Sequence, residues 1–258
     1  MKARARLTVE LDPRGRSVVR ELTSASPLTL MPRRGAVRPA AGPTDRAVVH
    51  LVNSVTSPLG GDELDLRVRV GAGARLLLRG VAATLVLPGH RRGGSRSTVH
   101  VEVAEGGTLE YLPEHTVVTA RAEHEAEFRA ELAQDALVRC REVLVLGRSN
   151  ERPGVLRTST HVTRGEVPLV RQTLELGNSR LEASAGYLAG ARVVATESVV
   201  WKNDPVAPTS GEWWSLTPLA AGGATATALA SDAVTAQYRL TEALRTHPDG
   251  KELMEERW

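Results

Sequence analysis

Two carboxylates stand on strand faces that are otherwise apolar, and they are the side chains of this sequence best placed for chemistry. Alternation along residues 137–146 puts Glu142 on the same side as Cys140. The same alternation puts Asp62 in line with Leu64. An unpaired buried carboxylate is costly, so each needs an arginine, a backbone donor, water or a cation nearby. Two interpretations stay open: an internal ion pair or turn cap, or a polar passage whose oxygen ligands transiently meet a divalent metal.

The motifs of nucleotide and metal chemistry are incomplete in this sequence. Gly71-Ala-Gly73 follows a predicted strand, but a dinucleotide-binding fingerprint would need glycine at Leu76 and then a helix. His124-Glu125 begins a metalloprotease pattern whose second histidine would fall at Phe128. The sequence has no phosphate-binding loop and no nucleophile elbow, and its seven histidines show no ligand spacing. The lone Cys140 gives no argument for a catalytic thiol.

The composition is that of an ordinary globular protein. Hydrophobic residues make up 41% of the 258 positions and aromatic residues only 3%, which predicts a mostly aliphatic core. Because 33 basic residues are scattered among 30 acidic ones, without interleaved aromatics, we expect no nucleic acid partner. The single cysteine fits a reducing compartment, and no apolar run has the length of a membrane span. We expect a cytoplasmic protein with no membrane partner, built as one domain over residues 1–258.

Alternating hydrophobicity predicts strands along most of the chain. Residues 123–132 are an informative conflict, because their alanine, glutamate and arginine content favours a helix by intrinsic propensity. Their alternation instead places Phe128 on one side and the glutamates on the other, so we predict a strand. Further strands are predicted at residues 62–70, 99–103, 109–111, 137–146, 156–163, 169–176, 180–187 and 192–201.

Turns that contain glycine or proline separate these segments at short intervals. The pattern predicts a mainly β fold, with many short strands in a β-sandwich or β-helical scaffold and a few helices. Residues 1–201 form the strand-rich part of the predicted domain. Residues 202–258 form a part that is rich in helix breakers and then helical.

One helix is predicted near the C-terminus, over residues 232–245. Four side chains recur there at the spacing of one helix face, namely Val234, Tyr238, Thr241 and Leu244. Ser231 is the predicted N-cap, and His247-Pro248 ends the helix.

Five motifs occur in order between about residues 50 and 175. They are Gly60-Gly61-Asp62 before an alternating strand, Gly71-Ala-Gly-Ala74, Ala82-Ala-Thr84, Gly107-Thr-Leu-Glu-Tyr-Leu-Pro-Glu114 and Glu142-Val-Leu-Val-Leu-Gly-Arg148. Each motif is weak alone. Their order and spacing together resemble the UreD family of urease accessory proteins, which is also called UreH.

The resemblance implies a non-catalytic scaffold that binds apo-urease, a UreF-like helical protein and, through it, a UreG-like GTPase. It also implies that nickel passes through an interior tunnel to the urease active site, as cargo in transit rather than a permanently bound cofactor. The family's tunnel-lining positions carry over to Asp62, Thr84 and Glu142, with both carboxylates as stepping points for nickel. Where the resemblance leads us to expect a further acidic residue, this sequence has Gln172.

Two other functions stay open. A β-fold glycoside hydrolase could use Asp62 and Glu142 as its carboxylate pair, but they would have to lie about 5 to 10 Å apart in an open cleft. Such a cleft also needs aromatic platforms, and the sequence has few aromatic residues. The other alternative is an interaction module in which the acidic residues serve only the fold.

Overall fold

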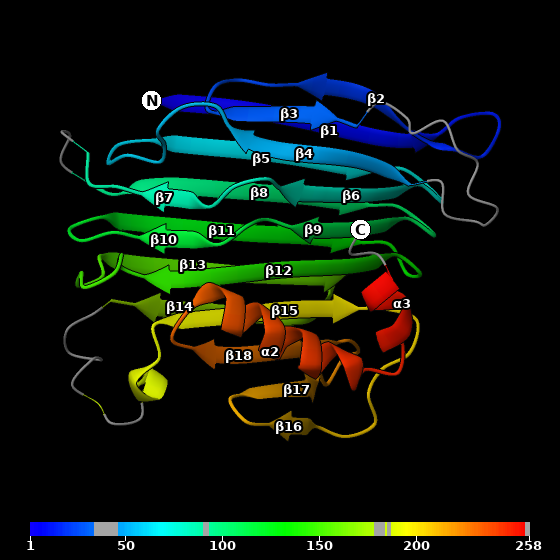
Figure 1. Cartoon of the computed structure of the whole chain (residues 1–258). Helices are drawn as coiled ribbons and strands as arrows, with labels where there is room; N and C mark the ends of the chain where they lie inside the picture. Colours follow the sequence, from blue (N-terminus) through cyan, green and yellow to red (C-terminus); the bar gives the residue numbers. More distant parts are fainter. Residues whose placement is uncertain (34–45, 90–92, 178–183, 185–186, 256–258) are drawn as a thin grey trace.

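The computed structural model describes residues 1–33, 46–89, 93–177, 184 and 187–255. Within these residues the chain forms two β-sheets that face each other, and two α-helices lie against the outer side of one of them (Figure 1). This architecture confirms the mainly β fold with a few helices that the sequence predicts.

The first sheet, sheet A, has seven strands in the order β14-β13-β11-β8-β5-β1-β2. Its strands are β1 (Lys2–Leu11), β2 (Ser17–Thr23), β5 (Glu63–Val70), β8 (Ser95–Val103), β11 (Glu123–Leu132), β13 (Val155–Arg164) and β14 (Val167–Leu176). Neighbouring strands from β1 to β13 run parallel, and the two end strands pair antiparallel.

The second sheet, sheet B, has the order β16-β17-β18-β15-β12-β9-β6-β4-β3; the short strand β10 also pairs with β12, and β7 pairs with β10. Its strands are β3 (Leu28–Pro32), β4 (Ala47–Asn53), β6 (Arg75–Gly80), β7 (Thr84–Val86), β9 (Thr108–Leu112), β10 (Thr116–Val118), β12 (Leu137–Leu146), β15 (Val193–Val200), β16 (Thr209–Gly211), β17 (Trp214–Pro218) and β18 (Ala224–Ala230). Strands β4, β6, β9 and β12 run parallel, and the sheet continues antiparallel from β12 to β16.

Successive strands in the middle of the chain alternate between the two sheets. Strands β5, β8 and β11 belong to sheet A, and the strands that follow them, β6, β9 and β12, belong to sheet B. Parallel neighbours need a crossover connection, and here the opposite sheet provides it. Each coil of the chain therefore adds one strand to each sheet, which is a β-helical arrangement (Figure 1).

Glycine turns connect the strands of successive coils and contact one another. Gly73, between β5 and β6, and Gly106, between β8 and β9, have φ angles of 66° and 63°, which favour glycine. The amide of Gly73 donates to the carbonyl of Glu105 at 2.8 Å, so one turn is hydrogen-bonded to the next. The Gly71-Ala-Gly73 motif therefore serves the turn geometry of the coil.

The predicted C-terminal helix is confirmed as α2 (Ala233–Arg245), and a short helix, α3 (Gly250–Glu255), follows it. The N-cap prediction was wrong by one residue. Asp232, rather than Ser231, caps the helix, because its side chain accepts a hydrogen bond from the amide of Thr235 at 2.9 Å.

The predicted apolar face of α2 is confirmed only in its second half, where Thr241 and Leu244 are buried. Val234 and Tyr238 are 78% and 61% exposed, whereas Ala236, Leu240 and Leu244 are buried. The buried side chains pack over the small alanines of β18, which let the helix approach the sheet closely. Packing against β18 therefore decides which side of the helix faces inward.

The main core lies between the two sheets and is mostly aliphatic. Leu66 of β5, Leu76 of β6 and Leu109 of β9 are fully buried, and each contributes roughly 2 kcal/mol through burial. The single phenylalanine, Phe128, stacks on Tyr111 with ring centroids 5.4 Å apart. Because Phe128 belongs to sheet A and Tyr111 to sheet B, this pair joins the two layers.

Most of the predicted strands are confirmed, including β11, whose composition favours a helix. The strand predicted over residues 180–187 falls almost entirely outside the described residues. Strands β16, β17 and β18 lie within residues 202–258, where the sequence indicated only breakers and a helix. Alternation of alanine and threonine along β18 is a weak signal, because both side chains are small.

Candidate functional site

Glu142 lies between the two sheets, as its position on the apolar side of β12 predicts. The hydroxyl of Thr158, on β13 of the opposite sheet, donates a hydrogen bond to Oε1 of Glu142 at 2.6 Å. Alternation places both side chains on the inward faces of their strands. The pair therefore forms a polar bridge between layers that are otherwise joined by apolar contacts.

A cavity of about 160 Å³ surrounds this bridge. This volume has room for several water molecules. Oxygen-bearing side chains from both sheets line it beside Glu142, namely Asn53, Thr84, Thr116, Thr158, Thr160, Thr196 and Ser198. Leucine and phenylalanine side chains complete the wall. The cavity therefore offers hard oxygen donors on an apolar background.

Burial sets the protonation states of the titratable groups in this wall. It raises the pKa of Glu142 to about 7, and the Thr158 hydrogen bond only partly opposes the rise. Burial lowers the pKa of His124 to about 4, so its imidazole is neutral at pH 7, and its Nδ1 lies 2.8 Å from the Ser95 hydroxyl. Burial also raises the pKa of Cys140 to about 12, so its thiol stays protonated.

Two other glutamates contribute to the wall, but the carboxylate of one of them is engaged elsewhere. Glu127 forms an ion pair with Arg129 on the outer face of sheet A and lies 4.0 Å from Nδ1 of His161. Glu114 follows β9 and lies against Gly80 of β6. Glu142 differs from Glu127 in that its carboxylate points between the two sheets and accepts a hydrogen bond from a hydroxyl of the opposite sheet.

Asp62 is buried, as predicted, but it does not line this cavity. Its carboxylate lies 2.5 Å from the Met1 ammonium and accepts hydrogen bonds from the Ser57 hydroxyl and the Leu59 amide, both at 2.9 Å. Burial acts most strongly and would raise the pKa of Asp62, yet these three donors together hold it below its ordinary value. Asp62 is thus an ion pair and a turn cap, with Gly61 at φ 86° providing the turn.

The structure separates the four candidate residues into two groups. Thr84 lines the same cavity as Glu142 and accepts a hydrogen bond from the Asn53 side chain at 3.1 Å. Gln172 lies on β14, an end strand of sheet A, opposite Thr160, and does not line the cavity. Glu142 and Thr84 therefore share a site, whereas Asp62 and Gln172 lie outside it.

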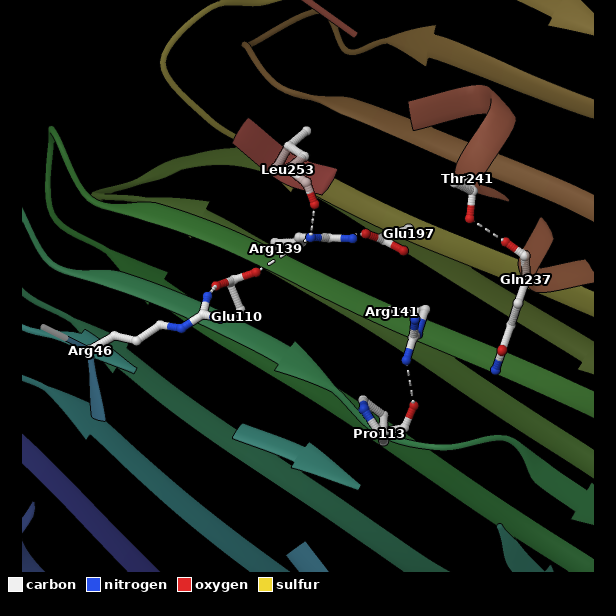
Figure 2. A network of polar contacts seen from close by, with 9 residues as sticks. All are labelled: Arg46, Glu110, Pro113, Arg139, Arg141, Glu197, Gln237, Thr241 and Leu253. Carbon is white, nitrogen blue, oxygen red and sulfur yellow. Dashed lines mark hydrogen bonds and ion pairs between the residues drawn. The ribbon is translucent and has the colours of Figure 1, made fainter. Parts of the chain in front are cut away.

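A buried ionic network lies on the opposite side of β12, beneath α3 (Figure 2). Arg139 pairs with Glu197 of β15 through Nε, and its Nη1 lies 3.4 Å from Glu110 of β9. The same Nη1 donates to the carbonyl of Leu253 in α3 at 2.7 Å. Glu110 also pairs with Arg46 at 2.8 Å. This network ties the last helix to sheet B.

Two searches of the described residues gave negative results. No group of three or more histidine, cysteine, aspartate or glutamate side chains in that part of the chain could hold a metal ion. None of the described helices combines the length and the apolarity that crossing a membrane requires.

Comparison with known proteins identifies the family. The family model of the UreD urease accessory protein matches residues 1–254. The chain is 63% identical to the urease accessory protein UreD 1 of Saccharopolyspora erythraea over the full length of both chains. It is 38% identical to UreD of a Parafrankia species, covering 93% of this chain and 86% of the relative. The chain belongs to the UreD family.

A more distant UreD, from Streptomyces avermitilis, is 36% identical and covers 95% of this chain and 96% of its own. All of these relatives are named as accessory proteins, which fits a role other than catalysis. The geometry of this UreD-family chain likewise gives no support to a glycosidase pair, because Asp62 and Glu142 do not share a cavity.

Two residues of the UreD site did not stand out in the sequence. Thr158 follows from the alternation of residues 156–163, which puts it on the same side as Leu156, but a lone threonine gives no signal by itself. His124 has no ligand spacing to the other histidines in the sequence, and the structure places it at the cavity wall in contact with Ser95. Only the pairing of β8 with β11 brings that serine and histidine together.

Proposed function

We propose that this UreD-family chain is the scaffold through which nickel reaches urease during GTP-dependent maturation. In this role it binds apo-urease together with UreF-like and UreG-like accessory proteins, and it catalyses no reaction of its own. Nickel is cargo, and the protein holds no permanent cofactor. Membership of a family whose members are named urease accessory proteins supports this role.

The observation that carries the proposal is the cavity between the sheets, with the Glu142 carboxylate held opposite the Thr158 hydroxyl. Carboxylate and hydroxyl oxygens can replace part of the hydration shell of a divalent cation. A conducting site must bind strongly enough to admit the ion and weakly enough to release it. A carboxylate held between the sheets by a neutral hydroxyl meets both conditions better than a cage of cysteine and histidine.

The protonation state of Glu142 fits cation transit. Because burial raises its pKa to about 7, the carboxyl is close to half protonated at neutral pH. An entering cation stabilises the ionised form, so the carboxyl releases its proton as the cation binds. When the cation leaves, the carboxyl returns to its half-protonated state, which reduces the unpaired charge left between the sheets.

A second candidate function is a pure interaction module, in which the acidic residues serve only the fold. The surroundings of Asp62 favour it for that residue, because an ammonium, an amide and a hydroxyl already satisfy its carboxylate. The two functions differ in what they predict for Glu142.

The discriminating experiment is coexpression of urease and its accessory proteins with the Glu142→Gln variant of this chain. We expect the variant to copurify with its partners, while the nickel content of the urease falls at least about tenfold, because the amide cannot ionise. Glu131→Gln, on the outer face of β11, is the matched control and should leave the nickel content unchanged. Normal nickel content with Glu142→Gln would favour the interaction module.

A further inference from the structure

A single line of basic residues crosses the outer face of sheet A. Strand pairing places these residues directly opposite one another on six successive strands, from β1 to β14. We call them the basic row, and its members are Arg6, Arg67, His100, Arg129, His161 and Arg171.

The other rows of this face mix charges. Four residues along each strand, toward the start of β1, lies a row that alternates strictly between cation and anion, namely Lys2, Glu63, Arg96, Glu125, Arg157 and Glu175. Opposite charges on neighbouring strands stabilise a sheet, and like charges directly opposite destabilise it. The basic row therefore departs from the pattern that the fold alone would favour.

Carboxylates beside the row compensate only part of its charge. Asp65 lies 3.3 Å from Arg67 and 3.9 Å from His100. Two strands further along, Glu127 repeats this arrangement, pairing with Arg129 and lying 4.0 Å from His161.

The guanidinium groups of the row stay accessible despite these ion pairs. The side chains of Arg67 and Arg129 are 62% and 54% exposed, and Arg6 and Arg171 are exposed at the two ends. Four arginines thus face two carboxylates, which leaves a positive line available to a partner.

The spacing of the row indicates the shape of its partner. Neighbouring strands lie about 4.8 Å apart, so the six residues span about 24 Å. An α-helix advances about 5.4 Å per turn, so a helix laid across the strands presents one side chain per turn at nearly the spacing of the row. An extended strand repeats on one face only every 6.8 Å or so, and that mismatch accumulates along the row.

We propose that the basic row binds an α-helix of a partner protein that carries carboxylates along one face, at i, i+3 or i+4 spacing. The charge on both sides of the row favours such a helix over nucleic acid. The row on one side holds Asp65 and Glu127 with Arg4, and the row on the other side holds Glu102 and Glu131 with Arg69. Each flanking row thus has two carboxylates and one cation, and a phosphate backbone wider than the basic row would meet this net negative charge. The rows described here also lack the aromatic side chains on which bases stack.

Two synthetic peptides test the proposal directly, and the test requires neither nickel nor urease. Both are alanine-based helices of about 18 residues, or five turns, with the same number of glutamates. One has its glutamates along a single face and the other has them distributed around the helix. We expect the single-face peptide to bind the intact protein about tenfold more tightly, measured by fluorescence anisotropy at about 50 mM salt.

Charge reversal within and outside the row provides the matched variants. We expect Arg67→Glu combined with Arg129→Glu to remove the preference for the single-face peptide. Arg96→Glu combined with Arg157→Glu changes the net charge equally on the same sheet face, and should retain that preference. All four side chains are exposed, and circular dichroism will verify that both double variants keep their fold.

Three results would overturn the proposal. The first is equal affinity of the unmodified protein for the two peptides. The second is an equal loss of preference in the two double variants, which would make the effect one of net charge. The third is that a single-stranded oligonucleotide of similar length binds the protein more tightly than the single-face peptide does. That result would identify the row as a nucleic acid site.

Discussion

Replacing Glu142 by glutamine should change how the stability of the protein depends on pH. Glutamine keeps the size of the protonated carboxyl and can accept the hydrogen bond that the Thr158 hydroxyl donates, but it cannot ionise. At low pH the variant and the unmodified protein should therefore have similar free energies of unfolding. As the pH rises, only the unmodified protein must either keep a proton on Glu142 or bury a charge.

The size of the effect follows from the raised pKa. In the folded protein the pKa of Glu142 is about 7, against an ordinary value of 4.5, so the folded state binds the proton more tightly than the unfolded state does. The resulting stabilisation is fully present below about pH 4.5 and is lost as the pH rises through about 7. A shift of this size corresponds to roughly 3 kcal/mol in the free energy of unfolding.

Urea unfolding at several pH values between about 4 and 8, followed by tryptophan fluorescence, measures this difference. We expect Glu142→Gln to match the unmodified protein at the acid end and to exceed its free energy of unfolding by roughly 3 kcal/mol at the alkaline end. Glu131→Gln, on the outer face, should show no such trend. Parallel stability curves for Glu142→Gln and the unmodified protein would refute the reasoning that burial controls this carboxyl.

Three further predictions concern the fold around the site. Arg139→Met should lower the free energy of unfolding by about 3 to 5 kcal/mol in urea titrations, because it leaves Glu197 buried without its cation while Glu110 keeps Arg46. A loss below about 1 kcal/mol would contradict this. Asp232→Ala should lower the free energy of unfolding by about 1 kcal/mol in the same titrations, because α2 loses its N-cap. An unchanged urea midpoint would count against that cap. Cys140 should react with a thiol reagent only after denaturation, because it is buried and its pKa is raised to about 12; rapid labelling of the folded protein would be inconsistent with this placement.

Side-chain alternation was sufficient to predict much of the fold and the direction of Glu142. In β11 the alternation of Phe128 with glutamates correctly predicted a strand against helix propensity, because a strand buries one whole side between the sheets. The same periodicity placed Glu142 inward, since a one-residue shift would have turned every apolar side chain of β12 outward.

Contacts between residues far apart in the sequence limited the rest of the prediction. Parity indicates that Asp62 points inward, but its ammonium partner comes from Met1, which the parallel pairing of β1 with β5 brings alongside. The exposure of Val234 and Tyr238 on α2 has a similar cause, because packing against the alanines of β18 buries Leu240 instead. The basic row is equally invisible in the sequence, since its members become neighbours only through strand register.

The central claim is that nickel passes through the cavity between the sheets, and a size series at Thr158 tests it most directly. Thr158→Val removes the hydroxyl at nearly constant volume, and Thr158→Phe fills the space beside Glu142. The measurement is the nickel content of urease matured with each variant, after copurification has verified that the accessory complex still assembles. We expect a modest loss of nickel content with valine and an almost complete loss with phenylalanine. Full nickel content with an assembled phenylalanine variant would contradict the claim.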